Sequence, residues 1–348
     1  MFTTLLFLSS GLFLGWSLGA NDAANIFGTA VGTKMLRFKV AAIIASVFVI
    51  IGAVYGGAGT SHTIGLLGEI ERLPGAFTVA LAAALTVLWM TRAGLPVSTT
   101  QAIVGAILGW NLFSGHPTNM EMLYKIFGTW VFSPILTAII SVILFIILKY
   151  IVENMHIHLL RLDALTRIGF VIVGAFGAYS LGANNIGNIM GIFITGVPFR
   201  DIQIGNVLEF SAAQQLFFLG GIAIAIGICT YSKKVMTTVG SDIFKLSPIT
   251  GLAVVLASSI TLFLFASQGL KLFLESHGLP SFPLVPISSS QAVVGGVVGI
   301  SLVKGGRNIN LKLLGKIALG WIVTPIGAAI LAYIALFFVQ NVFMQPVV

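Results

Sequence analysis

Apolar runs long enough to cross a lipid bilayer recur along almost the whole chain. Of its 348 residues, 57% are hydrophobic and only 8% are charged, whereas soluble proteins carry about 25% charged residues. A spanning helix needs about 20 consecutive apolar residues. Division of the chain at its polar connections therefore predicts an all-α polytopic membrane protein with about 10–12 transmembrane segments.

Two nearly identical polar segments interrupt these apolar runs. Residues 19–25 read GANDAAN, and residues 182–188 read GANNIGN. Polar side chains are costly within a membrane and usually mark a transport pathway or a binding site. Because the glycines in both segments permit the backbone to unwind, we expect each segment to break the helix that contains it.

The two polar segments belong to a longer internal repeat, in which three elements recur in the same order. The matched pairs are residues 19–25 and 182–188, residues 95–101 (LPVSTTQ) and 285–291 (VPISSSQ), and residues 125–134 and 316–325. Three elements in one order are much stronger evidence than any single motif. The repeat predicts three regions: a first repeat at 1–148, a short polar linker at 149–167 and a second repeat at 168–348.

The charges of the loops predict opposite orientations for the two repeats. The loop after the first Asn motif carries Lys34, Arg37 and Lys39, whereas the matching loop of the second half carries Arg200 balanced by Asp201. In the next pair of loops the bias is reversed. Cytoplasmic loops are enriched in Lys and Arg, so we expect two inverted-topology repeats with broken helices and helical hairpins, as in many secondary transporters. Both termini would lie outside and the linker would be cytoplasmic.

The two Asn motifs carry the oxygen ligands of a candidate cation site. Asp22 and Asn25 are spaced i, i+3, as are Asn185 and Asn188, so each pair lies on one helical face. Carboxylate and amide oxygens suit a hard cation such as Na⁺. The alternative is that these side chains hold helices together. Glu209 is the second acid in apolar surroundings, although a carboxylate at the membrane interface is equally expected there. The candidate cation ligands are Asn21, Asp22, Asn25, Asn184, Asn185, Asn188 and Glu209.

The two Ser/Thr-Gln segments are candidate anion-binding helix starts. Ser98 and Gln101, like Ser288 and Gln291, have the spacing of a capping box, which by itself predicts only a well-capped helix. A helix N-terminus also attracts anions through its free N–H groups and its dipole. The candidate anion ligands are Asn25, Ser98, Thr99, Thr100, Gln101, Asn188, Ser288, Ser289, Ser290 and Gln291.

No Lys or Arg lies within any of these four motifs. An anion bound close to Asp22 would therefore lack compensation in a medium of low dielectric constant. Cations bound together with the anion would supply the missing charge and would couple the movement of the two species. Na⁺ is the economical choice, and protonation of Asp22 is the alternative.

The motifs GANDAANIFGTAVGTK, GANNIGNIMG, PVSTTQ and PISSSQ resemble those of the inorganic phosphate transporter (PiT) family, over nearly the whole chain. The resemblance implies an ion-coupled phosphate importer with twelve membrane helices in two inverted repeats, a homodimer, and functional positions at the Asn/Asp and Ser/Thr-Gln residues named above. Family members often have a Glu in the second span of each half. Glu209 fits the second of these positions, whereas Val49 occupies the first.

We therefore expect a Na⁺-coupled symporter that imports phosphate across the cell membrane by alternating access, with Na⁺ as co-substrate and no other cofactor. Sulfate transport, proton coupling and a passive anion channel are the alternatives. An enzyme acting on phospholipids is disfavoured, because no pair of acidic residues is available to hold a metal. The net charge of +8 lies in the connections and predicts contact with anionic lipid rather than nucleic acid.

Overall fold

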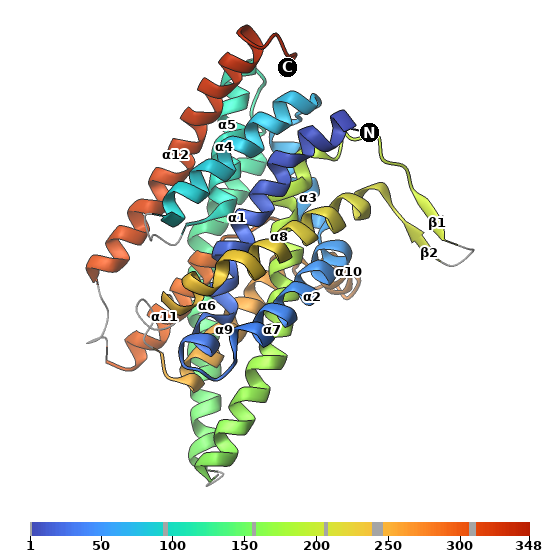
Figure 1. Cartoon of the computed structure of the whole chain (residues 1–348). Helices are drawn as coiled ribbons and strands as arrows, with labels where there is room; N and C mark the ends of the chain where they lie inside the picture. Colours follow the sequence, from blue (N-terminus) through green and yellow to red (C-terminus); the bar gives the residue numbers. More distant parts are fainter. Residues whose placement is uncertain (1, 93–96, 155–157, 205–207, 239–245, 306–310) are drawn as a thin grey trace.

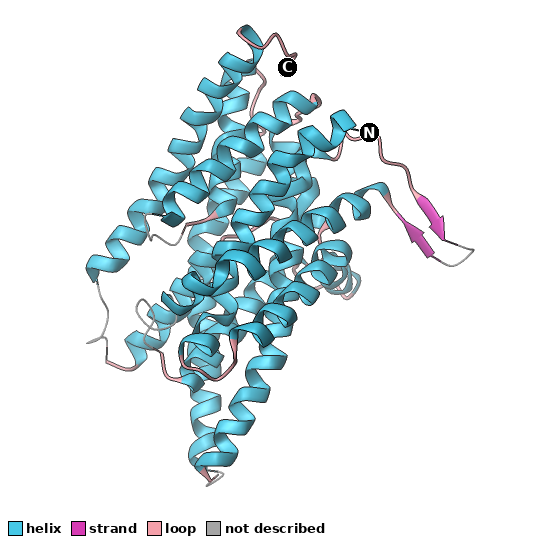
Figure 2. Cartoon of the chain, in the orientation of Figure 1, coloured by secondary structure: helices cyan, strands magenta, loops and turns pink. Residues whose placement is uncertain are grey.

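The computed structural model describes residues 2–92, 97–154, 158–204, 208–238, 246–305 and 311–348. Almost all of this part of the chain is helical (Figures 1 and 2). The helices are α1 (Phe2–Gly32), α2 (Phe38–Gly56), α3 (Ala58–Gly68), α4 (Leu73–Arg92), α5 (Thr99–Ser114), α6 (Met120–Asn154), α7 (Leu159–Met190), the 3-10 turn η1 (Gly191–Phe193), α8 (Ala212–Thr238), α9 (Pro248–Ala266), α10 (Gln268–Ser276), α11 (Ser289–Val303) and α12 (Leu311–Asn341). Strands β1 (Ile202–Ile204) and β2 (Leu208–Phe210) pair antiparallel.

The predicted polytopic helical membrane fold is confirmed. Among the described residues, seven helices are long and apolar enough to cross a membrane: α1, α2, α4, α6, α8, α9 and α12. The most apolar stretches of α6 and α12 are only 17% and 22% buried, whereas those of α4 and α9 are 61% and 67% buried. α6 and α12 therefore present apolar surface to lipid, while α4 and α9 lie inside the bundle.

α1 and α7 run without interruption through the two Asn motifs, so the expected breaks at these positions are wrong. The physical reason is that the glycines serve close packing instead of unwinding. A Cβ at Gly19 would collide with the backbone carbonyl of Ile224 on α8, and a Cβ at Gly182 with that of Val49 on α2. Each glycine thus lets a second helix approach the motif without disturbing the backbone hydrogen bonds of its own helix.

The interruptions occur instead where α5 and α11 begin. α5 has 16 residues and α11 has 15, so both are short for a membrane span. Their N-caps, Ser98 and Ser288, are extended in backbone conformation and buried in the protein interior. Two helix N-termini therefore lie inside the bundle, where a ligand can meet their free N–H groups.

Helix packing follows a mirrored pattern across the two halves. α1 packs against α8 and α7 against α2, while α5 packs against α12 and α11 against α6. Glycines mediate equivalent approaches: Gly105 lies against Pro325, and Gly295 lies against Pro134. Each half therefore supplies the packing partners of the other half, as two related and interlocked units would.

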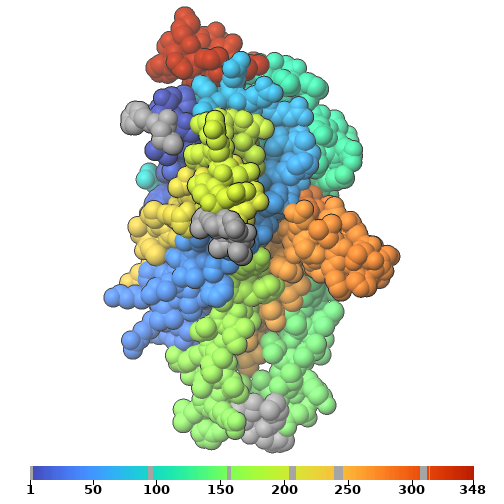
Figure 3. Space-filling model, turned by 90° about the vertical axis from the view of Figure 1, so that its right-hand side faces the viewer, coloured from blue at the N-terminus to red at the C-terminus, as the bar shows by residue number. Residues whose placement is uncertain are grey.

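Most of the polar linker expected at 149–167 is helical. α6 continues to Asn154 and α7 begins at Leu159, and the two ends project together from the body (Figures 1 and 3). Ion pairs at i, i+4 spacing join Lys149 to Glu153 at 3.7 Å and Arg167 to Asp163 at 2.7 Å. Such pairs support exposed helix ends, which explains why charged residues here do not interrupt the helices.

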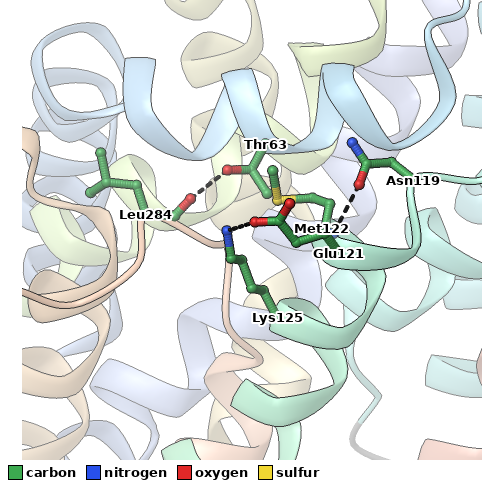
Figure 4. A network of polar contacts seen from close by, with 6 residues as sticks. All are labelled: Thr63, Asn119, Glu121, Met122, Lys125 and Leu284. Carbon is green, nitrogen blue, oxygen red and sulfur yellow. Dashed lines mark hydrogen bonds and ion pairs between the residues drawn. The ribbon is translucent and has the colours of Figure 1, made fainter.

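The extended segment that leads into α11 is held by α3 (Figure 4). Thr63 on α3 donates a hydrogen bond to the carbonyl oxygen of Leu284, four residues before the N-cap of α11. At the start of α6, Asn119 Oδ1 accepts from the backbone N–H of Met122 at 3.1 Å, which caps that helix. The first half of the chain therefore helps to place the second buried helix start.

Candidate ion and anion site

The structure brings the two Asn motifs and the two Ser/Thr-Gln segments together in one buried cluster. Each of these side chains is at most 8% exposed: Asn21, Asp22, Asn25, Ser98, Thr99, Thr100, Gln101, Asn184, Asn185, Asn188, Ser288, Ser289, Ser290 and Gln291. The motifs are far apart in sequence and come from α1, α7 and the starts of α5 and α11. We therefore treat them as one candidate site.

Asp22 lies at the junction between α1 and the start of α11. Its Oδ1 accepts a 2.9 Å hydrogen bond from Asn21 Nδ2, and its Oδ2 accepts a 2.8 Å bond from Ser289 Oγ. Asn25 Nδ2 donates to the same Ser289 oxygen at 3.3 Å. Among the described residues, the hydrogen-bond partners of this carboxylate are uncharged, and an uncompensated charge inside a membrane is expensive.

The mirrored contacts run from α7 in the second half to the start of α5 in the first half. Asn188 Nδ2 donates to Thr100 Oγ1 at 2.9 Å and to Asn185 Oδ1 at 3.0 Å. Asn185 Nδ2 donates to the carbonyl of Leu181 at 3.1 Å. The Asn motif of each half is thus bonded to the Ser/Thr segment of the opposite half.

Two backbone carbonyls that the sequence analysis missed complete the mirrored arrangement. Val97 O accepts from Asn21 Nδ2 at 3.4 Å and from Ser290 Oγ at 2.9 Å. At the equivalent position, Ile287 O accepts from Asn184 Nδ2 at 2.8 Å and from Thr100 Oγ1 at 3.2 Å. The available signal was positional, because each carbonyl belongs to the residue directly before an N-cap serine.

The predicted capping boxes are only half formed. Ser98 Oγ accepts from the N–H of Gln101, and Ser288 Oγ from that of Gln291, both at 3.2 Å. The return bond from each glutamine is missing, because both Oε1 atoms are buried without a partner. Thr99 Oγ1 and Asn188 Oδ1 are also buried and unpartnered. Buried polar atoms without partners are uncommon in proteins, so Thr99 Oγ1 and Asn188 Oδ1 are available to a bound ligand.

Glu209 does not join this cluster, in contrast to its assignment as a candidate cation ligand. It lies exposed on β2, opposite Gln203 on β1, before α8 begins at Ala212. The expected equivalence of Glu209 and Val49 in the two halves is also wrong. The carbonyls of Val49 and Ile224 occupy mirrored places against Gly182 and Gly19, so Ile224 is the structural counterpart of Val49.

Comparison with known proteins identifies the kind of protein that carries this cluster. A model described as the phosphate transporter family matches residues 18–332 and also residues 279–347. The chain belongs to this family. Its members are transporters rather than enzymes, in agreement with the expectation from sequence.

Three similar relatives, each named as a phosphate permease, span nearly the same length. The relative from Pyrococcus horikoshii is 26% identical over 403 residues, covering 94% of this chain and 95% of its own. The relative from Methanocaldococcus jannaschii is 27% identical over 322 residues, covering 92% and 93%. The relative from Haemophilus influenzae is 25% identical over 417 residues, covering 96% of each chain.

One solved structure has the same fold. It is described as the sodium-dependent phosphate transporter and superimposes with a TM-score of 0.73 at 23% sequence identity. The match covers 98% of this chain and 99% of that one. At this level of identity the likeness establishes the fold alone, and the chemistry has to be argued from the cluster itself.

Proposed function

We propose that the protein is a Na⁺-coupled symporter that imports inorganic phosphate by alternating access. The observation that carries this proposal is the bond from Ser289 Oγ to Asp22 Oδ2. It joins a carboxylate to the start of a buried helix, so a cation ligand and an anion-binding helix N-terminus become parts of one site. Membership of the phosphate transporter family and the names of the relatives support phosphate as the anion.

The anion would be held by hydroxyl and amide donors at the starts of α5 and α11. The side chains proposed for this role are Asn25, Ser98, Thr99, Thr100, Gln101, Asn188, Ser288, Ser289, Ser290 and Gln291. Helix N-termini offer unpaired N–H groups and positive dipole character to an oxyanion. Thr99 Oγ1 is buried and without a partner, so it is free to donate to a phosphate oxygen.

The cation would be held by oxygen atoms of the Asn motifs. Asp22 supplies the only carboxylate, and Asn188 Oδ1 is a buried acceptor without a partner. Asn21, Asn25, Asn184 and Asn185 complete the proposed set. Oxygen ligands of this kind suit Na⁺, and the positive charge of Na⁺ would offset both Asp22 and the anion. Neither ion would bind well alone, which is the physical basis of coupling.

Alternating access would follow from two inverted repeats, 1–148 and 168–348, moving against each other around the site. The mirrored packing of α1 on α8 and of α7 on α2 supports this division, as do the equivalent bonds at Val97 and Ile287. Transporters built from inverted repeats commonly bind substrate at the repeat interface. We further propose a homodimer in the cell membrane, with both termini outside and the α6–α7 ends in the cytoplasm.

Uptake of phosphate into proteoliposomes tests this function. We expect uptake to require an inward sodium gradient, to persist when the proton gradient is collapsed, and to be unaffected by excess sulfate. Uptake driven by a proton gradient and indifferent to sodium would contradict sodium coupling. Strong competition by sulfate would contradict the substrate assignment, and electrogenic flux without any cation dependence would identify an anion channel.

A further inference from the structure

Two tryptophans outside the four motifs have the same unusual property. Trp130 on α6 and Trp321 on α12 each lie four residues before a proline inside the helix. Both indole Nε1 atoms are buried without a hydrogen-bond partner. Burying an N–H group without a hydrogen-bond partner inside a membrane protein costs roughly several kcal/mol of folding free energy. Its occurrence at two matched positions therefore calls for a shared explanation.

The contacts between α6 and α11 set Trp130 and Gln291 in the same register. A Cβ at Gly295 would meet the backbone of Pro134, and a Cβ at Gly299 would meet Ala138. Both contacts advance by four residues along each helix, so the two helices run parallel in register. Gln291 lies four residues before Gly295, and Trp130 lies four residues before Pro134. Residues four apart share a helix face, so Gln291 and Trp130 lie at the same level on the facing sides of the two helices.

The same register holds between α5 and α12. Gly105 lies against Pro325 and Gly109 lies against Ala329, which places Gln101 level with Trp321 one turn earlier. The amide oxygens of both glutamines are also buried and unpartnered. Each of the two helix pairs, α6 with α11 and α12 with α5, therefore contains one unpaired donor and one unpaired acceptor at the same level.

The chemistry of these groups determines how they combine. An indole N–H only donates, and within the glutamine amide only Oε1 accepts. An oxyanion at the helix start requires the opposite end of the amide, because Nε2 donates and Oε1 would repel it. A bond from the indole to Oε1 would turn Nε2 away from the tryptophan and make it available to the anion.

We propose that Trp130 and Trp321 are positioning residues for the anion site. None of these four atoms has a partner in the structure, and the bond from each indole N–H to the amide oxygen at its level forms when the anion binds, orienting the amide with its N–H₂ group toward the anion. This rests on the proposed function, because it assigns an orientation to two of the anion ligands.

Phosphate binding by the purified full-length protein in sodium chloride, measured by titration calorimetry, tests the proposal. Trp130→Phe and Trp321→Phe keep the ring and remove the N–H. We expect each to weaken phosphate binding about five- to tenfold, the effect of losing one well-placed hydrogen bond. Trp16→Phe is the matched control, because the indole of Trp16 donates to Thr230 at 2.9 Å at an exposed position. It should bind phosphate as the wild type does.

A double-mutant cycle separates positioning from a general structural effect. In the Gln291→Ala background, Trp130→Phe should weaken phosphate binding no further, whereas in the Gln101→Ala background it should keep its full effect. Trp321→Phe should show the reverse dependence. Wild-type affinity in both tryptophan variants, or equal effects in matched and crossed backgrounds, would overturn the proposal.

The same double-mutant cycle can be measured as shifts in the midpoint of thermal unfolding, without phosphate and with saturating phosphate. This detects interaction between each tryptophan and its glutamine independently of transport. Coupling specific to the matched pairs should appear when phosphate is added. If the wild type bound no phosphate, the proposed function would fail and the pairing with it. Additive unfolding shifts in matched and crossed pairs alike, in a protein that binds phosphate, would refute the pairing alone. The two mirrored pairs provide a second test if a variant of one pair does not fold.

Discussion

Ser289 Oγ donates a 2.8 Å hydrogen bond to Asp22 Oδ2 across 267 positions of sequence. The two residues belong to different halves of the chain, and both are almost completely buried. Because the same serine oxygen also accepts from Asn25 Nδ2, a single hydroxyl links the acidic motif to the start of α11. Any movement between the halves must therefore change the environment of the carboxylate.

Replacement of Asp22 by asparagine should impair sodium-dependent phosphate uptake by about tenfold or more, since bonds to a charged group contribute about 1.5–3 kcal/mol. The substitution keeps the size of the side chain and removes its charge. Asn185→Asp should have a smaller effect, because it leaves the carboxylate of Asp22 in place. Initial uptake rates at several sodium concentrations measure both. Equal, wild-type-like uptake by the two variants would refute the assigned asymmetry.

Ser289→Ala should raise the sodium concentration needed for half-maximal uptake by about tenfold, because it removes a hydrogen bond to a buried carboxylate. Ser301→Ala is the control on the same helix. Ser301 lies twelve residues after Ser289, and its hydroxyl donates to the carbonyl of Val297, one turn back in α11. Identical sodium dependence in both variants would show that the link between Ser289 and Asp22 has no part in coupling.

Gly19→Ala should lower the midpoint of thermal unfolding in detergent, because the added Cβ would collide with the carbonyl of Ile224. Overpacking of this kind costs about 1–3 kcal/mol. Gly128→Ala in α6 is the matched control. A Cβ there has no heavy atom within 4 Å, and alanine is favoured over glycine in a helix by about 1 kcal/mol. An unfolding midpoint for Gly19→Ala at or above that of the wild type would contradict the close packing of α1 and α8.

Glu209→Gln should leave sodium-dependent uptake within about twofold of the wild type, as is usual for exposed positions. The residue is exposed on β2, opposite Gln203 on β1. Uptake rates of the variant and the wild type, measured at equal amounts of reconstituted protein, test this. A loss as large as that expected for Asp22→Asn would restore Glu209 to the cation site.

The membership of the central cluster could be predicted from sequence because polar side chains stand out in apolar surroundings. Asp22 and Ser289 were selected for that reason, and the doubling of their motifs indicated that they belong together. The backbone around them could not be predicted in the same way. Gly19 is compatible with an unwound helix and with a close helix contact, and only the distant carbonyl of Ile224 distinguishes the two.

The remaining errors also depend on contacts outside the local pattern. Glu209 sits in a short hairpin whose strands are too brief to show a period, so its exposure was not apparent. The charges after residue 148 indicate a polar linker but not its conformation, and the i, i+4 pair of Lys149 and Glu153 lies on a continuing helix. The proposed pairing of each glutamine with a tryptophan could be inferred only from the register of two parallel helices, and no sequence motif indicates that register.

The most direct test of sodium-coupled phosphate binding is a titration of the purified protein with phosphate at increasing sodium concentration, at constant ionic strength. The arrangement of Asp22 and the two helix N-termini predicts that the dissociation constant for phosphate falls steadily as sodium replaces choline, and that Asp22→Asn abolishes this dependence. A phosphate affinity that is the same in sodium and in choline would contradict the account.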